Sequence, residues 1–454
     1  MLPKRVLDRF VEQCPAGVMV RATLENLLRP ERLDQIFEDS AERQYSKVLL
    51  FSQVVAVMSG VATRTHRSVH GAYLASRQEL GVSATALYEK LNHLEPNVSS
   101  ALIRQTAGDA AKVIDAMPAG RRQVLAGREV YYLDGNHLGG SEHRLAVTRV
   151  TREGVLPGQS LALLDAQRGL IMDLVPCEDG HAQERALLPE LLRRLPAGIV
   201  VVADRNFCTT KFLFGLRERG AFFIIRQHAS TLTWKTVEPR RRIGRIQTGV
   251  VYEQKVELAD GPQRWRLRRI TLQLDRPTEN GDTEIHLLTN LPAKAVSAQQ
   301  IASIYRGRWT IEGVFQQLTA VLRCEVETLG YPKAALFAFA TAVLAYNTYA
   351  VVKAALRSAH GEQVIEEKLS DYHLMDHVAK AHTGMDVAVD AVAWEPYQRL
   401  SARQLGRQLV RWAKQVDLAR YPKKKRGPKK PRPARKRGNR NHHVATARLL
   451  TAPP

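Results

Sequence analysis

Two hydrophobic runs in this chain each end in an aspartate, and this pattern constrains the fold more than any other feature. Residues 130–133 (VYYL) precede Asp134, and residues 199–203 (IVVVA) precede Asp204. Runs this rich in β-branched and aromatic residues favour buried strands. A charge at the tip of a buried strand is costly unless it is paired or binds a metal. The pattern therefore predicts a sheet that carries two carboxylates at one edge.

A third acidic residue, Glu312, lies in a long predicted helix. The helix is expected to start at Ser297, which forms a capping box with Gln300, and to continue to residue 323. At 100° per residue, one polar stripe holds Tyr305, Arg308, Glu312, Thr319 and Arg323. An apolar stripe beside it can pack on the sheet, which would bring Glu312 towards the two aspartates. The alternative is an exposed i,i+4 pair between Arg308 and Glu312, worth a few tenths of a kcal/mol.

The chain divides into segments of different composition. Residues 1–124 favour helices. Residues 125–231 hold β-rich runs at 129–134, 145–150, 161–164, 170–175, 199–204 and 221–226, with helical stretches at 181–195 and 209–219. Residues 232–289 have the pattern of a β-rich insertion. Residues 290–354 contain Glu312, and residues 355–420 again have the pattern of helices. Strands followed by alternating strands and helices predict an α/β protein with a mixed sheet.

Residues 69–94 have the pattern of a helix, a tight turn and a second helix. Gly81 suits the turn and Ser83 suits the cap of the second helix. In a DNA-reading helix-turn-helix, the second helix would offer Lys90, Asn92 and His93 to a groove. An ordinary helical corner is the alternative.

The net charge of +22 indicates a polyanionic partner, most simply DNA. Residues 421–454 contain 6 Lys, 6 Arg and no acid, so this tail, predicted to be disordered, supplies +12. The remaining +10 is spread over the rest of the chain. Arg264, Arg266 and Arg268 alternate with apolar residues, which predicts a strand with one phosphate-facing side. A solvated edge strand protected by charge is the alternative.

The four cysteines are far apart and lack the spacing of zinc ligands, so we expect reduced, mostly buried thiols and no zinc. The N-terminus has no signal-peptide pattern, and a cytoplasmic protein is expected. Residues 335–352 are strongly apolar but include three polar residues. We interpret them as a buried core helix and not as a membrane span.

The acidic residues lie in signatures that resemble those of the DDE transposases of the insertion-sequence-four family. Asp134 matches that family's aspartate on the first strand, and residues 204–207 (DRNF) match its D-R-x-F motif. Tyr305, Arg308 and Glu312 match its Tyr-(2)-Arg-(3)-Glu-(6)-Lys signature. The resemblance covers roughly residues 125–350 and implies a ribonuclease-H-like core with a β-rich insertion.

One position departs from the family signature. Thr319 stands where the family has its lysine, which removes one expected contact to the DNA backbone. Arg323, one helical turn further on, is expected to compensate.

The resemblance implies a transposase that cleaves DNA and joins a mobile element's ends to target DNA. Two magnesium or manganese ions would be held by Asp134, Asp204 and Glu312, while Tyr305, Arg308 and Arg205 would contact the DNA backbone. A homodimer on DNA is expected, with no membrane partner. The alternatives are a DNA-binding protein with an inactive core, and a metal-dependent nuclease that cuts without joining.

Overall fold

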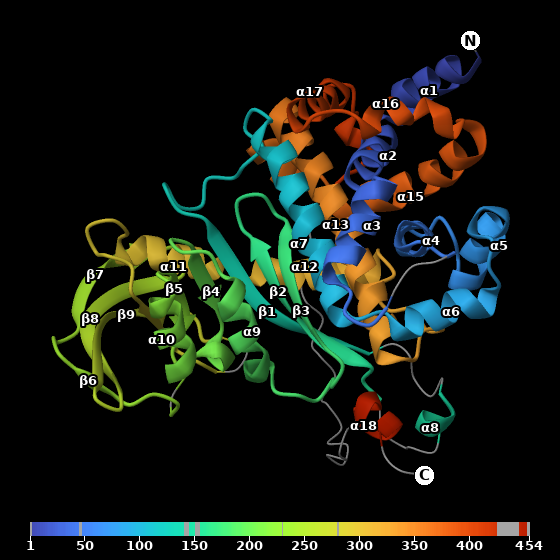
Figure 1. Cartoon of the computed structure of the whole chain (residues 1–454). Helices are drawn as coiled ribbons and strands as arrows, with labels where there is room; N and C mark the ends of the chain where they lie inside the picture. The colour runs from blue at the N-terminus through green and yellow to red at the C-terminus, as the bar shows by residue number, and fades with distance from the viewer. Residues whose placement is uncertain are drawn as a thin grey trace.

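The computed structural model describes residues 2–44, 48–139, 145–149, 155–228, 230–278, 281–424 and 445–451 (Figure 1). Its first seven helices are α1 (Leu2–Gln13), α2 (Pro15–Leu27), α3 (Pro30–Ser40), α4 (Phe51–Ala62), α5 (Val69–Leu80), α6 (Ala84–His93) and α7 (Pro96–Asp115). The later helices are α8 (Ala146–Arg149), α9 (Leu188–Arg194), α10 (Thr210–Glu218), α11 (Ala298–Arg306), α12 (Trp309–Ala320), α13 (Pro332–His360), α14 (Glu362–Lys368), α15 (Asp371–Ala388), α16 (Glu395–Gln398), α17 (Ala402–Ala413) and α18 (Thr446–Thr451).

The strands of the described chain form one mixed sheet. They are β1 (Val130–Leu138), β2 (Gly158–Asp165), β3 (Ile171–Cys177), β4 (Val200–Ala203), β5 (Phe222–Arg226), β6 (Trp234–Thr236), β7 (Arg241–Ile246), β8 (Gly249–Asp260), β9 (Gln263–Leu274) and β10 (Glu284–Thr289). Their order is β3-β2-β1-β4-β5-β10-β9-β8-β6, with β7 also paired to β8. Strands β1, β4 and β5 are parallel to one another, and the remaining pairs are antiparallel. The strands of 232–289 therefore continue the central sheet (Figure 1).

Side-chain alternation gives the sheet two covered faces. Val130, Tyr132 and Val202 belong to the hydrophobic cluster that includes residues of α7, α11, α12 and α13. Leu133 and Val201, one residue out of phase, belong to the opposite cluster with residues of α9 and α10. Successive side chains of a strand point to opposite faces, so one hydrophobic run supplies both clusters. This explains why β4, and β1 over residues 130–133, are apolar without interruption.

The apolar stretch 335–352 is part of α13. This helix is long and apolar enough to cross a membrane, and 94% of its most apolar window is buried inside the protein. Its polar residue Asn347 accepts from the Ile171 N–H and donates to the Ile171 carbonyl, both at 2.8 Å. The amide thus satisfies the open edge of β3 as a neighbouring strand would. The prediction of a buried core helix is confirmed.

The helix-turn-helix pattern folds as the sequence indicates. Helix α5 ends at Leu80, Gly81 takes the left-handed conformation (φ 63°), and the Ser83 side chain accepts from the Ala86 N–H. The four cysteines are free, and only Cys177 is partly exposed. The N-terminal helices share one hydrophobic cluster with α13 and the sheet, so residues of 2–124 are packed into the same core as the rest.

Two local predictions are wrong. Residues 146–149 form the short helix α8, which packs against α18, and not a strand. Two described parts of the predicted disordered tail are attached to the fold. Pro422 pairs with Leu369, and Ala445 pairs with Leu156 ahead of α18. The most basic part of the tail, residues 425–444, lies outside the described residues.

Candidate functional site

Asp134 and Asp204 each come directly after one of two residues that pair across neighbouring strands of the sheet. In the parallel pairing of β1 with β4, Leu133 lies opposite Ala203. The next residues of the two strands are the two aspartates, on the sheet face that α11 and α12 cover. Asp204 starts the turn after β4, where its Oδ1 accepts from the Asn206 N–H at 2.7 Å. The sequence-based expectation that the two residues lie together at one sheet edge fits this register.

Asp134 is not at the end of its strand, contrary to the prediction. β1 continues to Leu138, and Asp134 pairs with Ala162 of β2. Pairing with β4 stops at Leu133, since β4 ends at Ala203. The aspartates lie at an open edge of the sheet because β4 is short and ends at Ala203. The hydrophobic run of β1 alone does not predict this edge.

The predicted helix 297–323 is interrupted. Helix α11 ends at Arg306 and α12 begins at Trp309. Gly307 occupies the break and lies against Tyr132 of β1, since a Cβ added there would come within 2.1 Å of the tyrosine oxygen. Gly307 and Arg308 keep right-handed helical backbone angles across the break. Tyr305, Arg308 and Glu312 of the predicted polar stripe therefore still lie together.

The break places Arg308 between two of the acidic residues. Its Nη1 donates to Asp134 Oδ2 at 3.0 Å, and its Nη2 donates to Glu312 Oε1 at 2.7 Å. The Arg308 side chain is 9% exposed, whereas the Glu312 side chain is 45% exposed. Arg308 is therefore a buried bridge from β1 to α12, and not one half of an exposed helical pair.

Asp134 is an unusually basic carboxylate. Burial raises the pKa of Asp134 to about 6, and the nearby charges of Asp204 and Glu184 act in the same direction. The Arg308 guanidinium and the Gly135 N–H oppose them and lower the pKa. The site therefore stabilises added positive charge or a proton.

The donor chemistry of these residues fits a hard divalent cation. Asp134, Asp204 and Glu312 supply carboxylate oxygens, which Mg²⁺ and Mn²⁺ prefer. As the side chains stand, no three acidic, histidine or cysteine residues of the described chain are grouped closely enough to hold a metal. Arg308 provides between Asp134 and Glu312 the positive charge that a cation would provide.

Comparison with protein families supports the same region. Residues 158–348 match the family model described as "Transposase DDE domain". The matched stretch contains Asp204, Arg308 and Glu312, whereas Asp134 lies N-terminal to it. A search of curated proteins found no match.

The transposase-like stretch contains a further acidic residue that the sequence analysis missed. Glu184 begins the short 3₁₀ helix Glu184–Leu187, and its Oε2 accepts from Asn206 Nδ2 at 2.5 Å. Its carboxylate also lies against the backbone of Gly135, the residue after Asp134. No local pattern distinguishes Glu184 from the other acids of the predicted 181–195 helix. Only the packing of that segment on β1 and β4 identifies it.

The predicted DNA-contact residues of the transposase-like stretch differ in exposure. Arg205 is exposed beside Asp204, while Tyr305 is buried next to Arg308. Burial raises the pKa of Tyr305, so its hydroxyl stays protonated and can donate a hydrogen bond. Arg264 and Arg266 are exposed on β9, as expected for a surface that meets phosphates.

Arg268 contradicts the prediction of a phosphate-facing side chain. It is 8% exposed, pairs with Glu253 at 2.7 Å, and donates to the carbonyls of Leu291 and Val296. The three arginines do share a strand face. The segment after β10 covers that face at Arg268 and leaves it open at Arg264 and Arg266.

Two other predicted DNA contacts, Arg323 and Lys90, are engaged inside the protein, and so is Thr319 at the position of the missing lysine. Arg323 lies beyond the end of α12, and its side chain donates to the Arg67 carbonyl, so it does not continue the polar stripe of Glu312. Thr319 donates its hydroxyl to the Phe315 carbonyl at 3.0 Å. The ammonium of Lys90 lies 4.2 Å from the centre of the Phe37 ring, and burial lowers the pKa of Lys90.

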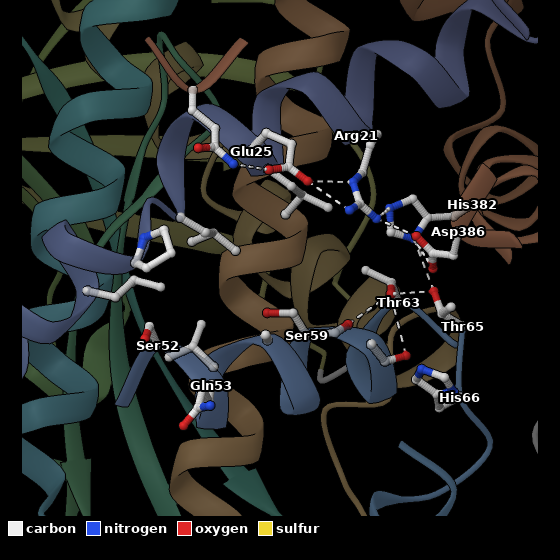
Figure 2. A pocket seen from close by; sticks show the side chains of 18 of the residues that line it. Arg21, Glu25, Ser52, Gln53, Ser59, Thr63, Thr65, His66, His382 and Asp386 are labelled. Carbon is white, nitrogen blue, oxygen red and sulfur yellow. Dashed lines mark hydrogen bonds and ion pairs between the residues drawn. The ribbon is translucent and has the colours of Figure 1, made fainter. Parts of the chain in front are cut away.

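A separate cavity of about 460 Å³ lies among the N- and C-terminal helices (Figure 2). At one side, Arg21 bonds with Glu25 at 2.8 Å and also pairs with Asp386. His382 accepts from Arg21 and contacts the Thr65 hydroxyl at 3.1 Å. These charges satisfy one another, and none of the three predicted acidic residues lines this cavity.

Proposed function

We propose that this protein is a metal-dependent DDE transposase of the insertion-sequence-four type. The observation that carries the proposal is the placement of Asp134 on β1 and of Asp204 directly after the adjacent parallel strand β4, with Arg308 linking Asp134 to Glu312. The match of residues 158–348 to a transposase DDE domain supports it independently. The strand order β3-β2-β1-β4-β5, with β1, β4 and β5 parallel, supports a ribonuclease-H-like core.

In this proposal Asp134, Asp204 and Glu312 would hold two magnesium or manganese ions. Bound ions supply charge neutralisation at the attacking and leaving oxygens of an in-line phosphodiester displacement. The high pKa of Asp134 means that its carboxylate favours such positive charge. The Glu312 side chain is 45% exposed, against 18% for Asp134, so it has room to rotate from Arg308 towards the aspartates.

Arg308 and Tyr305 position the DNA backbone beside the acidic residues. The buried guanidinium carries an Nε that has no hydrogen-bond partner among the described residues. A backbone phosphate can accept from a guanidinium through two oxygens, which fixes its orientation. Arg205 lies beside Asp204 and adds positive charge there. The strand register places Arg264 and Arg266 towards the opposite end of the sheet, where they would contact a separate part of the DNA. Such contacts place DNA without reading its sequence.

The proposed substrates are the ends of a mobile element and a target DNA, with each protomer of a homodimer acting on one end. One observation favours a second candidate, a DNA-binding protein with an inactive core. Thr319 replaces the lysine of the family signature and is bonded to its own helix, so one positive contact to DNA is missing.

The test uses a linear duplex that carries the DNA flanking this protein's own reading frame, with a supercoiled plasmid as target. With Mg²⁺ present, the wild-type protein is expected to cut at the flanks and to join the cut ends to the plasmid. Cutting without joined product would support a nuclease that cuts but does not join. No cutting, with DNA binding retained, would contradict catalysis by this site.

A further inference from the structure

Glu184 lies directly over the peptide that follows Asp134. A Cβ placed on Gly135 would be 2.0 Å from Glu184 Oε1 and 2.6 Å from its carboxyl carbon. The backbone of Gly135 is part of a regular strand, so glycine is required there for space and not for an unusual conformation. Any side chain at position 135 would displace the carboxylate of Glu184.

Glu184 also holds the turn that carries Asp204. Its Oε2 accepts from Asn206 Nδ2 at 2.5 Å, while the Asn206 N–H donates to Asp204 Oδ1 at 2.7 Å. Arg185 Nε donates to Asn206 Oδ1 at 3.2 Å, which directs the amide nitrogen towards Glu184. Asn206 thus connects the two carboxylates: its side chain donates to Glu184, and its backbone N–H donates to Asp204.

The placement of Glu184 is not explained by charge pairing. Among the described residues, no Lys, Arg or His lies within ion-pair distance of its carboxylate. Arg308, the buried arginine of the acidic site, is bonded to Asp134 and Glu312 instead. An additional acid beside Asp134 and Asp204 adds electrostatic repulsion to the protein alone, and a bound cation would relieve that repulsion.

We propose that Glu184 is a positioning residue of the acidic site, which holds the Asp204 turn through Asn206 and adds negative charge beside Asp134 across Gly135. The inference rests on the proposed function, because it assigns Glu184 to the binding of the divalent cation. Residues that support metal ligands typically change metal affinity 10–100-fold when they are mutated. We expect an effect of about this size for Glu184.

The experiment measures Mn²⁺ binding by calorimetry in the absence of DNA, together with thermal unfolding in chelator. Glu184→Gln and Glu184→Ala are expected to bind Mn²⁺ about 10–100-fold more weakly than wild type. The ion-free unfolding temperature of Glu184→Gln should be unchanged or higher, since a repulsive charge is removed and the amide can still accept from Asn206. Glu184→Ala also loses that hydrogen bond. Glu190→Gln is the matched control, because Glu190 pairs with Arg194 on the adjacent helix α9 and should bind Mn²⁺ as wild type does.

Gly135→Ala provides a second route to the same result. It keeps the Glu184 carboxylate but displaces it, so Mn²⁺ binding should weaken, and the double variant with Glu184→Gln should be little weaker than either single variant. Wild-type Mn²⁺ affinity in Glu184→Gln would overturn the inference. So would a lower ion-free unfolding temperature with binding intact, which is the result of a purely structural role. If the wild-type protein binds no Mn²⁺, the proposed function itself fails.

Discussion

Arg308 and Asp134 form a buried ion pair between α12 and β1, with Nη1 and Oδ2 at 3.0 Å. The two residues are 174 positions apart in the chain. Burial alone would disfavour the Asp134 charge, and it does raise the pKa of this residue to about 6. The pair therefore links the start of the Glu312 helix to the acidic edge of the sheet.

Arg308→Ala should destabilise the ion-free protein by roughly 1–3 kcal/mol, because Asp134 loses its charged partner in a buried position. Added Mg²⁺ should then raise the unfolding temperature of the variant more than that of wild type, since a cation replaces the missing charge. Thermal unfolding with chelator and with Mg²⁺ measures both effects. Arg306→Ala, an exposed change at the end of α11, is the control. An equal Mg²⁺ response in variant and wild type would contradict the competition between Arg308 and a cation.

Glu312→Gln should abolish DNA cleavage and joining while DNA binding is retained. The substitution preserves shape and can still accept from Arg308, but it removes the charge of a proposed metal ligand. The Glu312 side chain is 45% exposed, so we expect the free energy of unfolding to change by less than about 0.5 kcal/mol. Strand transfer in Mg²⁺ and a gel-shift assay give the two readouts. Joined product at the wild-type level would remove Glu312 from the site.

Arg264 and Arg266 should contribute to DNA affinity through phosphates. Each replacement by Ala is expected to weaken binding to all sequences alike and to reduce the slope of log affinity against log salt by roughly 0.9. Titrations at several salt concentrations measure the slope. Arg407→Ala is the control, since it is exposed on α17, across the molecule from β9 in Figure 1. An unchanged slope in both β9 variants would exclude this strand from the interface.

His382 should make the protein acid-sensitive. Burial lowers the pKa of His382 to about 4, with Arg21 and His66 acting in the same direction and Asp386 and Glu25 opposing. An unfolded histidine titrates near pH 6.5, so unfolding takes up a proton between the two values. The stability present above pH 6.5 is therefore lost as pH falls towards 4. The loss from pH 7 to pH 5 should be on the order of 1–2 kcal/mol.

Chemical denaturation at each pH tests this expectation. In His382→Gln, the amide can still accept from Arg21 and donate to Thr65, but it does not titrate. The variant should lose less stability than wild type over the same range. Parallel curves for the two proteins would show that His382 is not the group responsible.

The sequence by itself determined the main strands and helices near the site. The hydrophobic runs in 129–134 and 199–204 predicted β1 and β4, and their burial on both faces follows from side-chain direction. The apolar stretch 335–352 predicted a core helix, and α13 is buried. Asp134, Asp204 and Glu312 were identified from local signatures, because each signature depends on residues adjacent in the chain.

Tertiary structure decided which of these side chains meet and what covers them. Tyr132 packs against Gly307 at the point where the predicted helix is interrupted. Arg308, the next residue, bonds to Asp134 at the acidic edge. The segment after β10 buries Arg268, although the same strand face exposes Arg264. Glu184 reaches Asn206 from a different element. Periodicity specifies the face of an element on which a residue lies, but the neighbour on that face is set by packing between segments distant in the chain.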